Sequence, residues 1–237
     1  LETPVSAFLK LTERHPKNSF LFESVEGGAV RGRYSAIGLK PDLIFQSNGE
    51  KCEINEDCLD GETEFTPLAA PTLDAMRDLL ERSKIDLPSE LPPMSAGVFG
   101  YMAYDTVRLM EHLPDVNEDV LGLPDSIFVR PTIMVIFDAV KDEMVMVHRV
   151  DVKEGVSAKT AYTTAIENLK EAILDLNAPV PHMHEVNIDE EDGAPLFEEP
   201  TSNTTPAHYK KMVKQAQKYI TEGDIFQVVL SQRFSAP

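Results

Sequence analysis

Two apolar runs near the middle of the chain decide the fold: IMVIFDAV (residues 133–140) and EMVMVHRV (residues 143–150). Lys141-Asp142 joins them, and two such runs around a two-residue connection are typical of a buried β-hairpin. The segment that follows, from Ser157 to Leu176, repeats apolar residues at steps of four and three. That spacing predicts an amphipathic helix, so the centre of the chain predicts a hairpin followed by a long helix.

The pattern continues toward the amino terminus. Thr3-Pro4 fits the start of a helix that runs to Arg14, and a second helix is predicted over 72–83. Strands are predicted over 20–25, 34–39, 43–46, 51–54 and 96–104. This mixture predicts an α+β fold in which antiparallel sheets pack face to face with flanking helices.

The last sixty residues have a different character. Residues 177–205 bear prolines and acids without periodicity, as in a solvated linker, and Thr205-Pro206 begins a helix that ends at Gly223. A strand is predicted from Asp224 to Ser235, and a lone strand leaves its backbone groups unpaired. We therefore expect a domain over 1–176, a linker over 177–205 and the opening of an incomplete second domain over 206–237. Packing of 206–237 onto the first sheet is the alternative.

Charge narrows the range of partners. The 237 residues include 22 Lys and Arg against 40 Asp and Glu, a net charge of -18. Such acidity disfavours binding to nucleic acid, which requires a basic surface. No apolar run approaches the ~20 residues of a membrane span, so no membrane partner is expected. Only Cys52 and Cys58 are cysteines, which suits a reducing, cytoplasmic location.

Polar residues mark a first candidate site in LFESVEGG (residues 21–28) and its return RGRYSAIG (residues 31–38). Glu23 and Ser24 stand where the predicted strand gives way to a glycine turn. A carboxylate and a hydroxyl placed there can bind the ammonium group of an amino acid. The alternative is a hairpin whose Glu and Ser only face water.

Two further segments stand out from the background. GVFGYMAYD (residues 97–105) has glycines in a strand, which indicates close backbone approach or a bend. GDIFQVVLSQRF (residues 223–234) carries Gln227 and Ser231 within an apolar strand, where protein or ligand must pair them. No metal motif accompanies these segments, because the two cysteines lack a second pair.

Together the three segments resemble the large component of anthranilate synthase, component I, in order and spacing over essentially the whole chain. Met94-Ser95-Ala96-Gly97 departs from the family pattern, which more often has an aromatic residue and a glycine pair. The resemblance implies conversion of chorismate and ammonia to anthranilate and pyruvate. It also implies Mg²⁺ as cofactor, a glutamine amidotransferase subunit that supplies ammonia, and feedback inhibition by L-tryptophan.

The resemblance also assigns residues. Ser24 and Glu23 are expected to contact tryptophan, with Arg33, Tyr34 and Ser35 as neighbours on the returning strand. Gln227 and Ser231 are expected at the floor of the substrate cavity, whereas the catalytic and magnesium-binding residues are expected beyond Pro237, so that this chain alone is inactive. The alternatives are aminodeoxychorismate synthase of folate biosynthesis, which shares the closing motif, and a stand-alone tryptophan-binding module.

Overall fold

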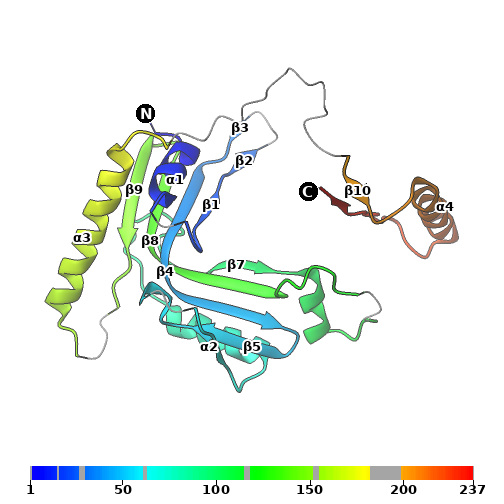
Figure 1. The fold of residues 1–237 in the computed structure, drawn as a ribbon, viewed down its shortest axis with the longest axis horizontal. Coiled ribbons are helices and arrows are strands. Elements are labelled where there is room, and N and C mark those ends of the chain that lie inside the picture. Colours follow the sequence, from blue (N-terminus) through cyan, green and yellow to red (C-terminus); the bar gives the residue numbers. More distant parts are fainter. Residues whose placement is uncertain are drawn as a thin grey trace. The chain divides into compact units, whose positions relative to one another are not determined.

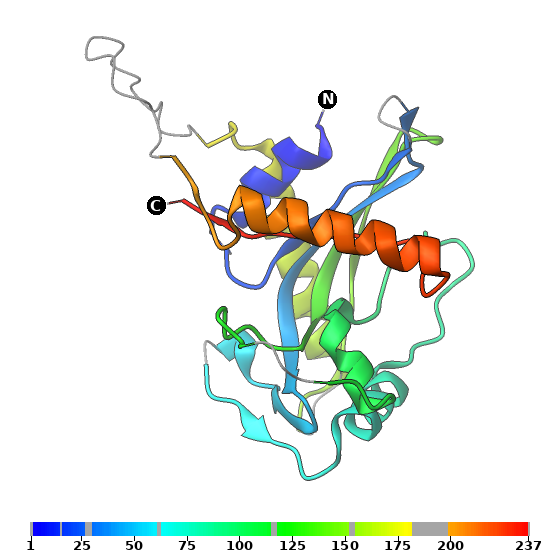
Figure 2. The same cartoon turned by 90° about the vertical axis from the view of Figure 1, so that its right-hand side faces the viewer.

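Two long antiparallel strands, β4 (Tyr34–Asn48) and β8 (Ser126–Asp138), form the centre of the first part of the chain (Figure 1). The computed structural model describes residues 2–14, 16–26, 30–60, 63–114, 118–151, 155–181 and 199–236. The chain divides into two units, residues 1–181 and 182–237, and both strands belong to the first unit. The view turned by 90° shows the two strands side by side again (Figure 2).

A seven-stranded sheet is built around this pair. Its order is β6-β5-β4-β8-β7, with β1 added to β4 and β9 added to β8. The bounds of the added strands are β1 Phe20–Phe22, β5 Lys51–Asn55, β6 Thr66–Pro67, β7 Phe99–Met102 and β9 Glu143–His148. Every pairing in this sheet is antiparallel, which confirms the predicted α+β class, and β8 with β9 is the predicted hairpin.

Proline interrupts the pairing of β4 and β8 at one point. Pro41 stands opposite Pro131, and the register shifts between Pro41 and Leu43. Neither proline has an N–H to donate, so a bulge replaces the regular ladder at this point. The sequence predicted two separate strands, 34–39 and 43–46. That prediction is wrong, because the bulge lets one strand continue past the proline.

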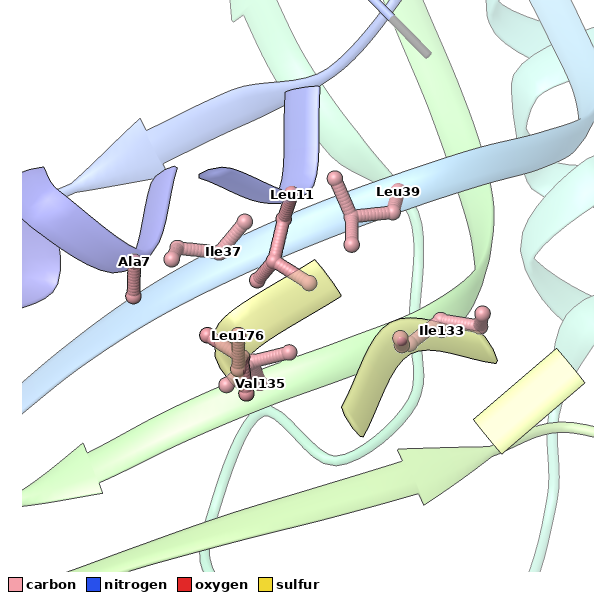
Figure 3. Close-up of a cluster of buried hydrophobic side chains, with 8 residues drawn as sticks. Ala7, Leu11, Ile37, Leu39, Ile133, Val135 and Leu176 are labelled. Atoms are coloured by element: carbon pink, nitrogen blue, oxygen red, sulfur yellow. The ribbon is translucent and has the colours of Figure 1, made fainter. Parts of the chain in front are cut away.

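Two helices cover the first half of β4. They are α1 (Pro4–Thr12), capped by Thr3, and α3 (Ala158–Asn177), capped by Ser157. Figure 3 shows the cluster of buried side chains that α1, α3, β4 and β8 contribute. Its buried members are Ala7, Leu11, Ile37, Leu39, Ile133, Val135, Ala172 and Leu176. Burial of this apolar surface stabilises the unit, at roughly 1.5–3 kcal/mol for each large aliphatic side chain.

The second half of β4 packs on a different helix, α2 (Thr72–Ser83). This core contains Leu43, Phe45, Cys52, Ile54, Ala75, Met76 and Leu79. A third cluster joins Phe20 of β1 to Phe99 of β7, with ring centroids 5.1 Å apart. The strands of the sheet therefore connect three hydrophobic clusters in one unit.

The remaining elements of this unit are β2 (Val25–Glu26), β3 (Val30–Arg31) and the 3₁₀ helices η1 (Cys58–Asp60) and η2 (Tyr104–Leu109).

The second unit contains β10 (Thr201–Ser202), α4 (Pro206–Glu222) and β11 (Phe234–Ser235) in its described part, 199–236. Thr205 caps α4, and Gly223 ends it in the left-handed conformation, φ 82°, as predicted. The predicted strand over 224–235 is wrong for all but its last two residues, which pair with β10. Because no other described segment of this unit pairs with 224–233, Phe226 and Val229 stay 93% and 83% exposed. Most of the predicted linker, 182–198, lies outside the described residues.

Candidate functional site

A cavity of about 620 Å³ lies in the first unit, where α1, β9 and the ends of β1, β4 and β8 meet. Glu23 and Ser24 follow the end of β1, Arg33 and Ser35 stand at the start of β4, and Asp138 ends β8. The first turn of α1 closes another side. Four of the five residues predicted for this site, Glu23, Ser24, Arg33 and Ser35, therefore line one cavity, because β1 and the start of β4 are paired antiparallel.

Arg33 and Asp138 form an ion pair in the wall of the cavity. Arg33 Nη2 lies 3.0 Å from Asp138 Oδ2, and Arg33 Nε donates to the same carboxylate. Hydrogen bonding from Arg33, with help from the backbone N–H groups of Lys141 and Val140, lowers the pKa of Asp138 to about 2. The guanidinium is half exposed, whereas the carboxylate is nearly buried. Arg33 is thus held in place and still presents donors to a ligand.

Gly32 positions Ser24. The Gly32 N–H donates to the Ser24 carbonyl oxygen at 2.8 Å, and a Cβ added to Gly32 would lie 1.8 Å from Ser24 Oγ. No other residue type fits there without displacing the serine side chain. The sequence singled out Ser24, but it gave no reason to link the serine to this glycine, because the close approach depends on the tertiary fold.

Among the charged side chains that line the cavity, carboxylates outnumber cations, and other parts of the lining are apolar. Besides Asp138, its described carboxylates are Glu2, Glu23, Asp142 and Glu143, against Arg33 as the cation. Apolar surface comes from Val5, Phe137 and Met144, among others. Excess negative charge attracts a cationic group, while Arg33 supplies paired donors for a carboxylate. The lining therefore suits a zwitterion that also has an apolar part.

Tyr34 is placed differently from its neighbours. Its ring packs against the core cluster of Ala36, Met134 and Ile136, and it does not line the cavity. The Arg33 guanidinium carbon lies 4.8 Å from the centroid of this ring, a cation–π contact. The Tyr34 ring therefore helps to hold the Arg33 guanidinium in position without contributing to the lining of the cavity. Asp138 was missed by the sequence analysis, and its only signal was an acid that ends the apolar run 133–137.

Gln227 and Ser231 belong to the second unit. Within its described part, 199–236, both side chains are exposed on the segment that pairs with no strand. Their expected place in a substrate cavity stays a prediction.

Among the described residues, no three His, Cys, Asp or Glu side chains gather closely enough to hold a metal ion. None of the helices in the described ranges is long and apolar enough to cross a membrane.

The structure is thus that of an α+β protein with a cavity at one end of an antiparallel sheet. The family model described as chorismate binding enzyme matches residues 17–237, and the chain belongs to this family.

Named relatives agree with that assignment, and the chain is homologous to anthranilate synthase component 1. The component of Cereibacter sphaeroides is 43% identical over 235 residues, which cover 99% of this chain and 46% of the relative. That of Thermus thermophilus is 36% identical over 246 residues, covering 100% and 46%. The structure of anthranilate synthase component I from Streptococcus pneumoniae has the same fold, with a TM-score of 0.65 at 22% identity over 90% of this chain and 44% of that chain. The chain thus spans about half the length of the curated relatives it matches.

Proposed function

We propose that the 620 Å³ cavity binds L-tryptophan and that this chain provides the tryptophan-sensing part of an anthranilate synthase large component. The observation that carries the proposal is the convergence of Glu23, Ser24, Arg33 and Ser35 on this one cavity. Ligand pockets of about 300–1,000 Å³ hold molecules of the size of an amino acid, so the volume is suitable. The homology to anthranilate synthase component 1 supports the same assignment.

The charges explain how tryptophan would lie in the cavity. Its ammonium group meets the carboxylate of Glu23 and the hydroxyl of Ser24. Its carboxylate meets the free donors of Arg33, which remain available because Asp138 holds the guanidinium from one side. The indole packs on apolar surface such as Phe137 and Met144. Each part of the ligand thus has a chemically matched partner.

In this proposal residues 1–176 form the regulatory domain, 177–205 the linker, and 206–237 the beginning of the chorismate-binding domain. The complete component converts chorismate and ammonia to anthranilate and pyruvate, with ammonia from a glutamine amidotransferase subunit. Tryptophan, the product at the end of the pathway, inhibits through the cavity.

Calorimetric titration of the 237-residue chain with L-tryptophan tests the site. We expect saturable heat for the wild type and at least a tenfold weaker affinity for Ser24→Arg, whose side chain enters the space of the ligand and competes for the carboxylates. Ser89→Arg is the matched control, because Ser89 is exposed and lies outside the cavity. Absence of heat from the wild type, or equal affinity of Ser24→Arg, overturns the assignment.

A second measurement tests the role in the complete component. There Ser24→Arg should raise the tryptophan concentration for half-inhibition at least tenfold while it leaves the rate of anthranilate formation nearly unchanged. Formation of aminodeoxychorismate instead of anthranilate would overturn the proposed reaction, because that product retains the enolpyruvyl side chain.

A further inference from the structure

A second cavity, of about 830 Å³, lies in the first unit and shares no lining residue with the first. Its described lining comes from the residues that follow α1, from β4, β8 and the end of β9, from one position of α3, and from Asn55, Cys58, Leu59, Thr63 and Phe65. We call it the basic cavity, because its described lining includes Arg14, Lys17 and Lys40.

The charge of the basic cavity is opposite to that of the chain. None of its described lining residues is Asp or Glu, although the chain carries 40 acids and a net charge of -18. Arg14 Nε lies 3.4 Å from Asp175 Oδ1, a carboxylate outside the lining, and Lys17 is exposed to solvent. A cavity lined by cations in an acidic protein concentrates anions locally.

Lys40 is the innermost of the three cations, with its side chain 19% exposed. Its backbone has φ 47°, in the left-handed region, directly before the bulge at Pro41. Bulges redirect side chains, and non-glycine residues in this region concentrate at functional sites. The Lys40 carbonyl accepts a hydrogen bond of 2.7 Å from Thr132, which fixes this conformation.

The Lys40 ammonium keeps donors for a ligand. Its ion pair with Glu171 is long, 3.4 Å, and Glu171 is 58% exposed, so solvent weakens the interaction. An ammonium has three donors, and this contact engages one of them. Nearby, Asn168 Nδ2 lies 3.1 Å from His148 Nε2, which places a polar pair in the same wall.

The rest of the wall is partly apolar. Ile44 and Ile127 come from the paired strands β4 and β8, and Phe65 comes from the segment before β6. From this geometry we propose that the basic cavity binds a small organic anion, whose carboxylate meets Lys40 and whose apolar body lies against Ile44 and Phe65. The site is separate from the proposed tryptophan cavity.

Benzoate, which combines a carboxylate with an apolar ring, is the probe. Titration of the ¹⁵N-labelled 237-residue chain followed by NMR should give saturable shifts of the Asn168 side-chain amide. Lys40→Gln should weaken binding about tenfold or more, because the charge and its hydrogen bond to the carboxylate are lost while the side chain stays polar. Lys84→Gln, an exposed lysine outside the cavity, is the matched control and should stay within twofold of the wild type.

Lys17→Gln provides a second variant should Lys40→Gln fail to fold. Lys17 is exposed at the rim, so its loss should leave the fold intact and weaken benzoate binding two- to threefold. The proposal is overturned if no saturable shift occurs, if Lys40→Gln and Lys17→Gln both bind benzoate as tightly as the wild type, if Lys84→Gln weakens binding as much as they do, or if inorganic phosphate binds as tightly as benzoate. Loss of the benzoate-induced Asn168 shift on addition of tryptophan also overturns it, because the basic cavity would then not be separate from the tryptophan site.

Discussion

Arg33 and Asp138 lie 105 positions apart in the chain, yet their side chains meet at 3.0 Å in the wall of the first cavity. The pairing of β4 with β8 produces this contact, since Tyr34 and Asp138 stand opposite each other in the register. Asp138 also accepts from the N–H groups of Val140 and Lys141 and so closes the turn to β9. One carboxylate therefore joins the candidate site to the hairpin that organises the sheet.

This arrangement predicts that the stability supplied by Asp138 is lost in acid. Its pKa falls from 3.8 unfolded to about 2 in the fold, so the contribution is complete above about pH 5 and disappears as pH falls from about 4 through 2. Urea unfolding should show Asp138→Asn less stable than the wild type at pH 7, with the difference shrinking below pH 4. A difference of constant size from pH 7 to pH 2.5 would show that the charge is not responsible.

Gly32→Ala should damage the site more than the fold. The new Cβ overlaps Ser24 Oγ, so the serine side chain must move, and we expect tryptophan affinity to fall at least tenfold in calorimetry. Gly49→Ala is the control, because Gly49 has open space around it but a positive φ of 55°. It should lose about 1 kcal/mol of stability and keep its affinity. Unchanged tryptophan binding in Gly32→Ala would argue against Ser24 as a contact.

Asp42 should be essential at the bend of the sheet. Its carboxylate accepts from Arg130 Nε at 2.8 Å and also pairs with Arg149, and all three side chains are at most 13% exposed. Asp42→Asn leaves two nearly buried guanidinium groups with the half-exposed carboxylate of Asp151 as their remaining described ionic partner, with an expected loss of about 3–5 kcal/mol in urea unfolding.

The matched variant for this prediction is Asp151→Asn. Asp151 pairs with the same Arg149 but is 51% exposed, so its removal should cost less than about 1 kcal/mol. Similar losses in the two variants would mean that burial does not decide the strength of this cluster.

Cys58 should resist alkylation in the folded chain. Burial, and then the nearby charge of Asp42, raise the pKa of its thiol to about 11, from 9.0 when unfolded. The reactive thiolate should therefore be about a hundredfold scarcer at pH 8 in the fold. Peptide mapping after iodoacetamide treatment, with and without urea, measures the two rates at Cys58. Equal rates in both conditions would disprove the expected protection.

Local patterns in the sequence were sufficient to predict the helices and the hairpin. The helix predicted over 72–83 matches α2 residue for residue, and the helix starts at Thr3 and Thr205 were readable because capping involves neighbours in the chain. The hairpin 133–150 was likewise visible, since its two strands are joined by a short turn. Ser24 and Arg33 could be grouped for a similar reason, because β1 and β4 are near each other in the sequence.

Only the tertiary structure determined the continuity of β4, the place of Asp138 in the site and the absence of a strand over 224–233. Pro41 looked like the end of a strand until its partner was known to be Pro131, ninety residues away in the chain, and the bulge between them could form. Asp138 joined the site through strand register, and residues 224–233 lacked the neighbour that a strand requires. A sequence fixes what each segment prefers over a few residues, whereas the burial, charge pairing and hydrogen bonding of a site depend on segments that approach only when the chain has folded.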